Sequence, residues 1–162
     1  MDVTLPVSVY EKDRLAGNQY DTLPRYFVYG GLVFTPLSYD YLKTLGRSSA
    51  DPANSDLVYE LFHRPQESPE TTRAEPIVLA TVLADEINAD VKTRGRTIVD
   101  KINGQRIDRL EDVIQAFETN TNAFDVIEFL PDGGVECLDH AGVAKADATL
   151  LRSYGITKDR RL

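Results

Sequence analysis

The sequence predicts one α+β domain with about six strands and two to four short helices. Runs of branched and aromatic residues recur between turn signals, as at residues 77–83 and 124–130, which is typical of strands. Apolar residues at helical spacing follow residue 109, which indicates an amphipathic helix. The length of 162 residues suits one domain with a core, residues 1–162, and is too short for two ordinary ones.

The first 25 residues are expected to contain an N-terminal strand and a connection. Apolar residues alternate with polar ones there, at Val3, Leu5, Val7 and Val9. This period of two is typical of a half-buried strand, and Pro6 favours a sheet edge because proline donates no ladder hydrogen bond. A short helix is predicted within residues 38–46, with Ser38 as its N-cap and Gly46 as its end.

Two adjacent glycines interrupt an otherwise strand-like stretch, YFVYGGLVFTPLS at residues 26–38. Glycine weakens a strand interior, so Gly30 and Gly31 require a reason. The residues alone leave two alternatives. One is a bulge or tight turn, which is the commoner cause. The other is the close approach of a ligand or another backbone.

Residues 47–76 change composition toward serine, proline, asparagine and acidic residues, and we interpret them as an insertion loop. Within it, residues 55–63 keep helical spacing of apolar side chains. Residues 64–75 have little apolar content and are expected to form a mobile surface loop.

The second half of the chain is more regular. Residues 77–83, 97–102, 124–130 and 135–138 are predicted strands, with hairpin turns at Asn103-Gly104 and Asp132-Gly133. One or two helical turns are expected at residues 85–91. A capping-box pattern at residues 108–111 opens a helix whose apolar face contains Leu110, Val113, Ile114 and Phe117. A C-terminal helix and tail are expected within residues 145–162, the helix starting at Asp147 and ending at Gly155.

The charge and composition argue against several classes of partner. The formal net charge is −8, whereas nucleic-acid binding needs a clustered basic surface. The basic cluster at residues 158–161 is expected to be a solvated tail. No apolar run reaches the length of a membrane span, and the N-terminus lacks the basic start and apolar core of a signal peptide.

The residue types needed for catalysis or metal binding do not form a recognisable pattern. His63 and His140 are the two histidines, and no serine lies in a nucleophile motif, so we expect both histidines to be surface or capping residues. Cys137, the single cysteine, is expected to be a buried, inert thiol. The sequence thus predicts no catalytic residues, no metal site and no cofactor.

Recognition through the backbone remains possible for such a chain. Two glycines expose successive N–H groups, and such a nest attracts an anion such as a peptide C-terminal carboxylate. The strand that follows could then pair with the peptide, with the 110–117 helix supplying an apolar wall. The candidate peptide-binding residues are Tyr29, Gly30, Gly31, Leu32, Val33, Phe34, Leu110, Val113, Ile114 and Phe117.

Several strings occur in an order that resembles the PDZ domains of the Deg/HtrA (Protease Do-like) serine proteases, and most of all their C-terminal second PDZ domain. The segment IVDKINGQRI at residues 98–107 resembles the strand–turn–strand segment of that family. The remaining matches are Tyr26-Phe27, Gly31, Val33-Phe34-Thr35, Ser38, Tyr41-Leu42, Val82-Leu83, Ile87-Asn88, Ala148-Thr149-Leu150 and Gly155-Ile156. The resemblance extends from about residue 26 to residue 156.

The resemblance implies a PDZ-like, partly open β-barrel or sandwich and a non-catalytic, peptide-binding module of a serine protease. Its partners would be peptide or protein C-termini or segments of its own chain, together with an upstream trypsin-like domain. Gly30 stands where PDZ loops usually have a larger apolar residue. This departure leads to an alternative, an assembly module whose groove is filled by its own chain and which forms a homo-oligomer. Bacterial members of the family act in the cell envelope or periplasm and plant members in organelles or the nucleus, so the resemblance gives no single location.

Overall fold

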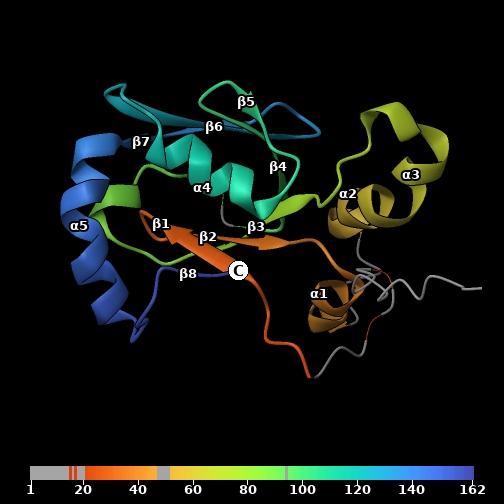
Figure 1. Ribbon diagram of the computed structural model, residues 1–162, viewed down its shortest axis with the longest axis horizontal. Coiled ribbons are helices and arrows are strands. Elements are labelled where there is room, and N and C mark those ends of the chain that lie inside the picture. The colour runs from red at the N-terminus through yellow and green to blue at the C-terminus, as the bar shows by residue number, and fades with distance from the viewer. Residues whose placement is uncertain (1–14, 16, 18–20, 47–51, 94) are drawn as a thin grey trace, which may run out of the picture.

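The computed structural model describes residues 15, 17, 21–46, 52–93 and 95–162. The strand expected at residues 3–9 lies outside these residues. Within them, one antiparallel sheet has the order β7-β6-β4-β3-β2-β1-β8, and β5 pairs with β4 (Figure 1). The strands are β1 (Tyr26–Tyr29), β2 (Leu32–Pro36), β3 (Ile77–Val82), β4 (Thr97–Ile102), β5 (Gln105–Arg106), β6 (Phe124–Leu130), β7 (Val135–Asp139) and β8 (Arg160–Arg161).

The helices lie around this sheet, with α5 at one end of the long axis and α2 and α3 at the other (Figure 1). The α-helices are α1 (Tyr39–Thr44), α2 (Ser55–Val58), α3 (Arg64–Glu67), α4 (Leu110–Glu118) and α5 (His140–Ser153). The shorter turns are η2 (Pro52–Asn54), the π-helical η3 (Tyr59–His63), η4 (Pro69–Thr71) and η5 (Glu86–Asn88). The predicted α+β class is confirmed. The short strand β5 follows the predicted Asn103-Gly104 turn and pairs with β4, whereas β8, which was not predicted, has two residues, too few to produce a periodic pattern.

The main core lies between the sheet and α4. The helix contacts β1, β2 and β4, and its apolar face is buried, as its spacing predicted. The Asp112 carboxylate accepts the N–H groups of Asp108 and Arg109 at 2.9 and 3.0 Å. The predicted capping at this helix therefore exists, but Asp112 provides it rather than Glu111.

A second core cluster covers the opposite face of β3 and β4. Leu57 and Leu61, from the helical run at residues 55–67, pack there with Val78 and Ile98, and all four are at most 1% exposed. The first half of β3 is therefore buried on both faces, which explains the continuous apolar run at residues 77–80.

Residues 64–75 are not the irregular loop that the sequence suggested. They contain α3 and η4, and Arg73 is only 4% exposed. The Arg73 guanidinium donates to the Ile107 carbonyl at 3.0 Å, pairs with Asp100, and lies 3.6 Å from the Glu60 carboxylate. Buried ion pairs and backbone contacts, rather than apolar side chains, attach this segment to the domain.

The last helix begins earlier than predicted. α5 starts at His140, where the Asp139 carboxylate caps it by accepting the Gly142 N–H, and Asp147 lies in its middle. Alanines and Gly142 replace larger apolar residues in the first turns, so the helical pattern in the sequence is weak there. Gly155 ends the helix with a φ of 69°, as predicted. Among the described residues, no helix is long and apolar enough to cross a membrane.

Candidate functional site

Gly30 and Gly31 form the two-residue turn of the hairpin between β1 and β2. Tyr29 pairs with Leu32 across it, and the glycine φ values are 54° and 82°. Hairpin turns of type I′ need positive φ at both central residues, which glycine adopts without strain. A Cβ on Gly31 would also collide with the Asn88 amide nitrogen and lie 2.5 Å from the Leu83 carbonyl oxygen. Both alternatives from the sequence therefore hold: this is a tight turn, and another part of the chain approaches it closely.

Three backbone groups of this turn are hydrogen bonded to other parts of the chain. The Gly30 N–H donates to the Asp147 carboxylate of α5 at 2.9 Å, and the Gly30 carbonyl accepts the Asn88 amide at 2.8 Å. The Gly31 carbonyl accepts the Leu83 N–H at 2.8 Å. Burial raises the pKa of the Asp147 carboxyl, although the Gly30 N–H acts in the opposite direction. The anion expected at this turn is thus a carboxylate of the same chain.

The strand after the glycines cannot accept a peptide. β2 is hydrogen bonded to β1 on one side and to β3 on the other, so the expectation that this strand pairs with a ligand is wrong. Leu32 and Phe34 are fully buried in the core, and Val33 is half-buried. The sequence correctly indicated a strand here, but periodicity does not reveal how many neighbours a strand has.

The predicted apolar wall does lie beside this hairpin. Leu110, Val113, Ile114 and Phe117 of α4 are all buried in the main core. The Phe117 ring stacks on Tyr29 with centroids 4.1 Å apart and lies 6.2 Å from the Phe27 ring. The structure therefore brings the predicted helix residues together with Tyr29 of β1 and with Phe34 of β2, whose ring centroid lies 5.8 Å from that of Phe117.

The outer edge of β1 is paired with the C-terminal segment of the chain. β8 runs antiparallel to it, with Arg161 opposite Tyr26 and Arg160 opposite Phe27. The Val28 N–H donates to the Asp159 carbonyl at 2.7 Å. The basic cluster expected to be a solvated tail is therefore part of the sheet, because an open strand edge supplies backbone partners that a sequence pattern does not reveal.

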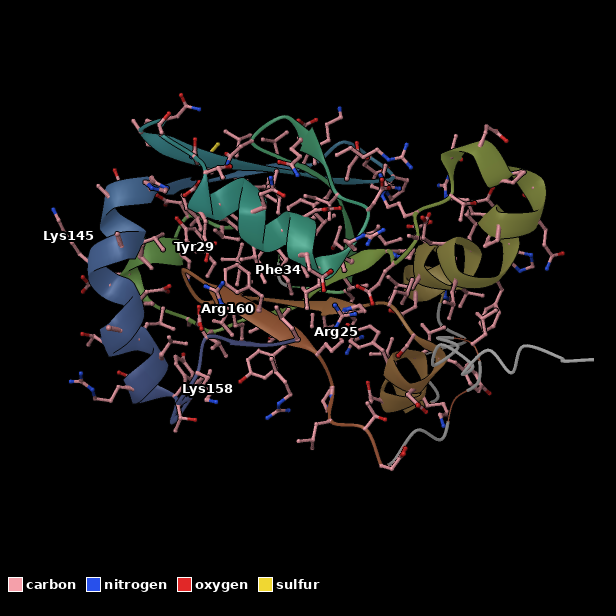
Figure 2. All side chains as sticks on the ribbon, viewed as in Figure 1. Arg25, Tyr29, Phe34, Lys145, Lys158 and Arg160 are labelled. Atoms are coloured by element: carbon pink, nitrogen blue, oxygen red, sulfur yellow. The ribbon has the colours of Figure 1, made fainter. Side chains whose placement is uncertain are left out.

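Side chains of β8 strengthen this pairing. The Arg160 guanidinium lies 5.0 Å from the Phe27 ring and 2.7 Å from the Glu118 carboxylate at the end of α4. Figure 2 shows Arg160 next to β1 and below α4. The Arg161 guanidinium lies 5.2 Å from the Tyr26 ring. The sequence interpretation missed Tyr26, Phe27, Glu118, Arg160 and Arg161, and the arginine pair was the one signal for them.

A buried carboxylate on β6 connects β1 with the start of α5. Asp125 of β6 is fully buried and accepts the Tyr29 hydroxyl at 2.7 Å, with His140 Nδ1 2.9 Å from the same oxygen. Its other oxygen accepts the side-chain amides of Asn103 and Asn120 at 3.1 and 2.7 Å. Burial, followed by the bond to Asp125, raises the pKa of the Tyr29 hydroxyl far above its ordinary value.

This network links side chains of β1, β6 and α5. It holds Tyr29 against α4 and fixes His140 at the first turn of α5, where Asp139 and not His140 caps the helix. Beside it, Asn103 and Asn120 help to line a polar cavity of about 190 Å³. Within the described part of the chain, no group of three or more histidine, cysteine or acidic residues is placed to bind a metal. Cys137, expected to be buried, is exposed because it lies on the outward side of β7.

An α4 helix packed beside a strand edge that has accepted another strand is the arrangement of a protein-interaction module. The family model of the PDZ domain matches residues 16–161, and the chain belongs to this family. PDZ domains are generally non-catalytic, and they bind peptides and proteins.

The curated relatives are proteases. The chain is 29% identical over 140 residues to Protease Do-like 4, mitochondrial, of Arabidopsis thaliana, a match that covers 86% of this chain and 23% of that protein. It is 28% identical over 138 residues to Protease Do-like 2, chloroplastic, of the same plant, over 85% of this chain and 21% of that protein. The chain therefore spans less than a quarter of the length of these relatives, and the resemblance to Do-like proteases stated from the sequence is confirmed.

Proposed function

We propose that this chain is a non-catalytic, regulatory interaction module of a Deg/HtrA-type serine protease, placed as its C-terminal second PDZ domain. It binds extended protein segments by strand addition at the outer edge of β1. The observation that carries this proposal is the pairing of β1 with β8, since an edge that accepts one strand by backbone hydrogen bonds can accept another. An upstream trypsin-like domain is the proposed partner within the parent protein.

The candidate residues keep a role in this proposal, with their positions revised. The buried side chains of α4 pack against Tyr29 and support β1 from the core side. The Gly30–Phe34 segment sets the position of β1 through the hairpin. Because β8 is antiparallel to β1, the end of an added strand points toward Tyr26 and not toward the glycines. A peptide C-terminus would therefore lie near Pro24, whose carbonyl already accepts the Arg161 guanidinium at 3.4 Å.

A second candidate function is assembly, with the groove occupied by the protein's own chain. The same β1–β8 pairing supports it, since β8 belongs to this chain and fills the edge. In this form, β8 of one copy would pair with β1 of another and build a homo-oligomer.

Nuclear magnetic resonance of the isotope-labelled full chain, combined with sedimentation at increasing concentration, tests both functions. For peptide capture, added extended peptides should shift the amide signals of β1, above all Val28, and the protein should stay monomeric. For assembly, the sedimentation mass should rise with concentration, and Arg160→Ala should reduce that rise. A monomeric protein whose β1 signals respond to no peptide, even when Arg160→Ala weakens β8, would overturn both.

A further inference from the structure

The segment on the β1 edge indicates what this edge prefers to bind. In an antiparallel pair, directly opposite residues place their side chains on the same face of the sheet, and consecutive residues alternate between faces. Arg160 is opposite Phe27 and Arg161 is opposite Tyr26. The two arginine side chains therefore lie on opposite faces of the sheet at the β1 edge, Arg160 over the Phe27 ring and Arg161 over the Tyr26 ring.

The face toward α4 is suited to a guanidinium. Arg160 lies 5.0 Å from the Phe27 ring, and its Nη1 is 2.7 Å from the Glu118 carboxylate. The neighbouring Asp159 carboxylate accepts the Arg160 Nε and Nη2 at 3.0 and 2.7 Å, which holds the planar group in one orientation. A lysine ammonium could not form this two-pronged contact while lying flat on the ring.

The opposite face takes the second arginine. The Arg161 guanidinium lies 5.2 Å from the Tyr26 ring and donates to the Pro24 carbonyl at 3.4 Å. In contrast, the side chain of Leu162 is 61% exposed and enters no apolar pocket. Recognition of β8 thus depends on the Arg160 and Arg161 side chains and not on burial of the apolar residue that follows them.

The groups that contact the two arginines of β8 would also be available to the arginines of another segment bound at this edge. Replacement of β8 would leave the Tyr26 and Phe27 rings and the Glu118 carboxylate in place, because all three belong to other elements. The chain as a whole has a net charge of −8, which favours approach of a basic segment.

We propose that the β1 edge selects an internal, extended protein segment with two adjacent arginines, ideally preceded by an acidic residue. This segment competes with β8 for the same place. The inference rests on the proposed strand addition and specifies its ligand class: arginine pairs within a strand, not a free C-terminus.

The test uses the full chain in two forms, wild type and the double variant Arg160→Ala/Arg161→Ala, which weakens β8. The probe is a fluorescein-labelled peptide, acetyl-Lys-Asp-Arg-Arg-Leu-amide, which copies residues 158–162 and lacks a free carboxylate. Fluorescence anisotropy should show binding that is at least about tenfold tighter to the double variant, because β8 no longer competes there. Circular dichroism first confirms that the variant is folded.

Substitutions in the peptide and at Glu118 test the individual contacts of the two arginines. Replacing both peptide arginines by alanine should weaken binding about tenfold or more, and replacing both by lysine should weaken it several-fold. Glu118→Gln, added to the double variant, should weaken binding about three- to tenfold. Asp132→Asn is the matched control, since it removes the same charge from an exposed turn and should have no effect.

A measurement on the otherwise wild-type chain provides a second readout. Glu118→Gln should speed hydrogen exchange of the Val28 amide, which donates to Asp159, and leave the Leu83 amide unchanged.

The possible failures are distinguishable. Equal binding of the arginine and alanine peptides would overturn the arginine preference while strand addition stands. Tighter binding of an apolar peptide with a free C-terminus would also overturn it, in favour of carboxylate recognition. If no peptide of any sequence binds the folded double variant, the proposed function itself fails.

Discussion

Replacement of Gly31 by alanine should destabilise the domain by about 3–4 kcal/mol. A φ of 82° costs alanine about 1 kcal/mol. The new methyl group would lie 2.5 Å from the Leu83 carbonyl oxygen and collide with the Asn88 amide. If Asn88 moves away, it loses its 2.8 Å hydrogen bonds to the carbonyls of Gly30 and Leu83, each worth about 1 kcal/mol.

Gly104→Ala is a closely matched control for this prediction. Gly104 has a similar φ of 79°, but no heavy atom would lie within 4 Å of an added Cβ. Its substitution should therefore cost only the backbone strain, about 1 kcal/mol. Urea unfolding followed by circular dichroism gives both free energies of unfolding. Losses that agree within about 0.5 kcal/mol would refute the close approach of Asn88 and Leu83 as the reason for Gly31.

Three further predictions concern other parts of the molecule. Asp125→Ala removes a buried carboxylate that accepts several hydrogen bonds, and it should lower the free energy of unfolding in urea by about 3–5 kcal/mol. Asp132→Ala, at an exposed position, should change it by less than about 0.5 kcal/mol. Similar losses in the two variants would contradict the hydrogen-bond network around Asp125. The raised pKa of Asp147 means that the folded state binds this proton more tightly than the unfolded state, so the stability from this group is lost as pH rises through the folded pKa. Asp147→Asn, which can still accept the Gly30 N–H, should therefore gain stability relative to the wild type between about pH 4 and pH 7, and a relative loss would show the opposite pKa shift. Cys137 is exposed and should react with a thiol reagent in the native protein nearly as fast as in the unfolded chain; protection of about 100-fold or more would place it in the core.

Elements with a clear period could be predicted from the sequence. The strands at residues 77–82, 97–102 and 124–130 and the helix at 110–118 agree with the predicted segments to within one or two residues. A period of two or of 3.6 reports which face of an element is buried, as in β6 and α4, and a run of branched apolar residues identifies a strand that is buried on both faces, as in the first half of β3.

Segments held by polar or backbone contacts could not be predicted in the same way. Arg73 attaches residues 64–75 through Asp100 and the Ile107 carbonyl, which are distant in the sequence. Asp125 resembles any acidic residue in an alternating strand, yet it is fully buried because Asn103, Asn120 and Tyr29 meet it in space. Such partners become visible only when the chain is folded.

The candidate site combines both situations. The sequence by itself marked Gly30 and Gly31 as a bulge or tight turn or a point of close approach, because glycine in a strand-like stretch needs such a reason, and it determined the apolar helix face that packs behind β1. Only the tertiary structure decided which strand has an available edge and what occupies it. Strand order and the β1–β8 pairing depend on backbone hydrogen bonds between distant segments, and all residues except proline offer the same backbone groups for them.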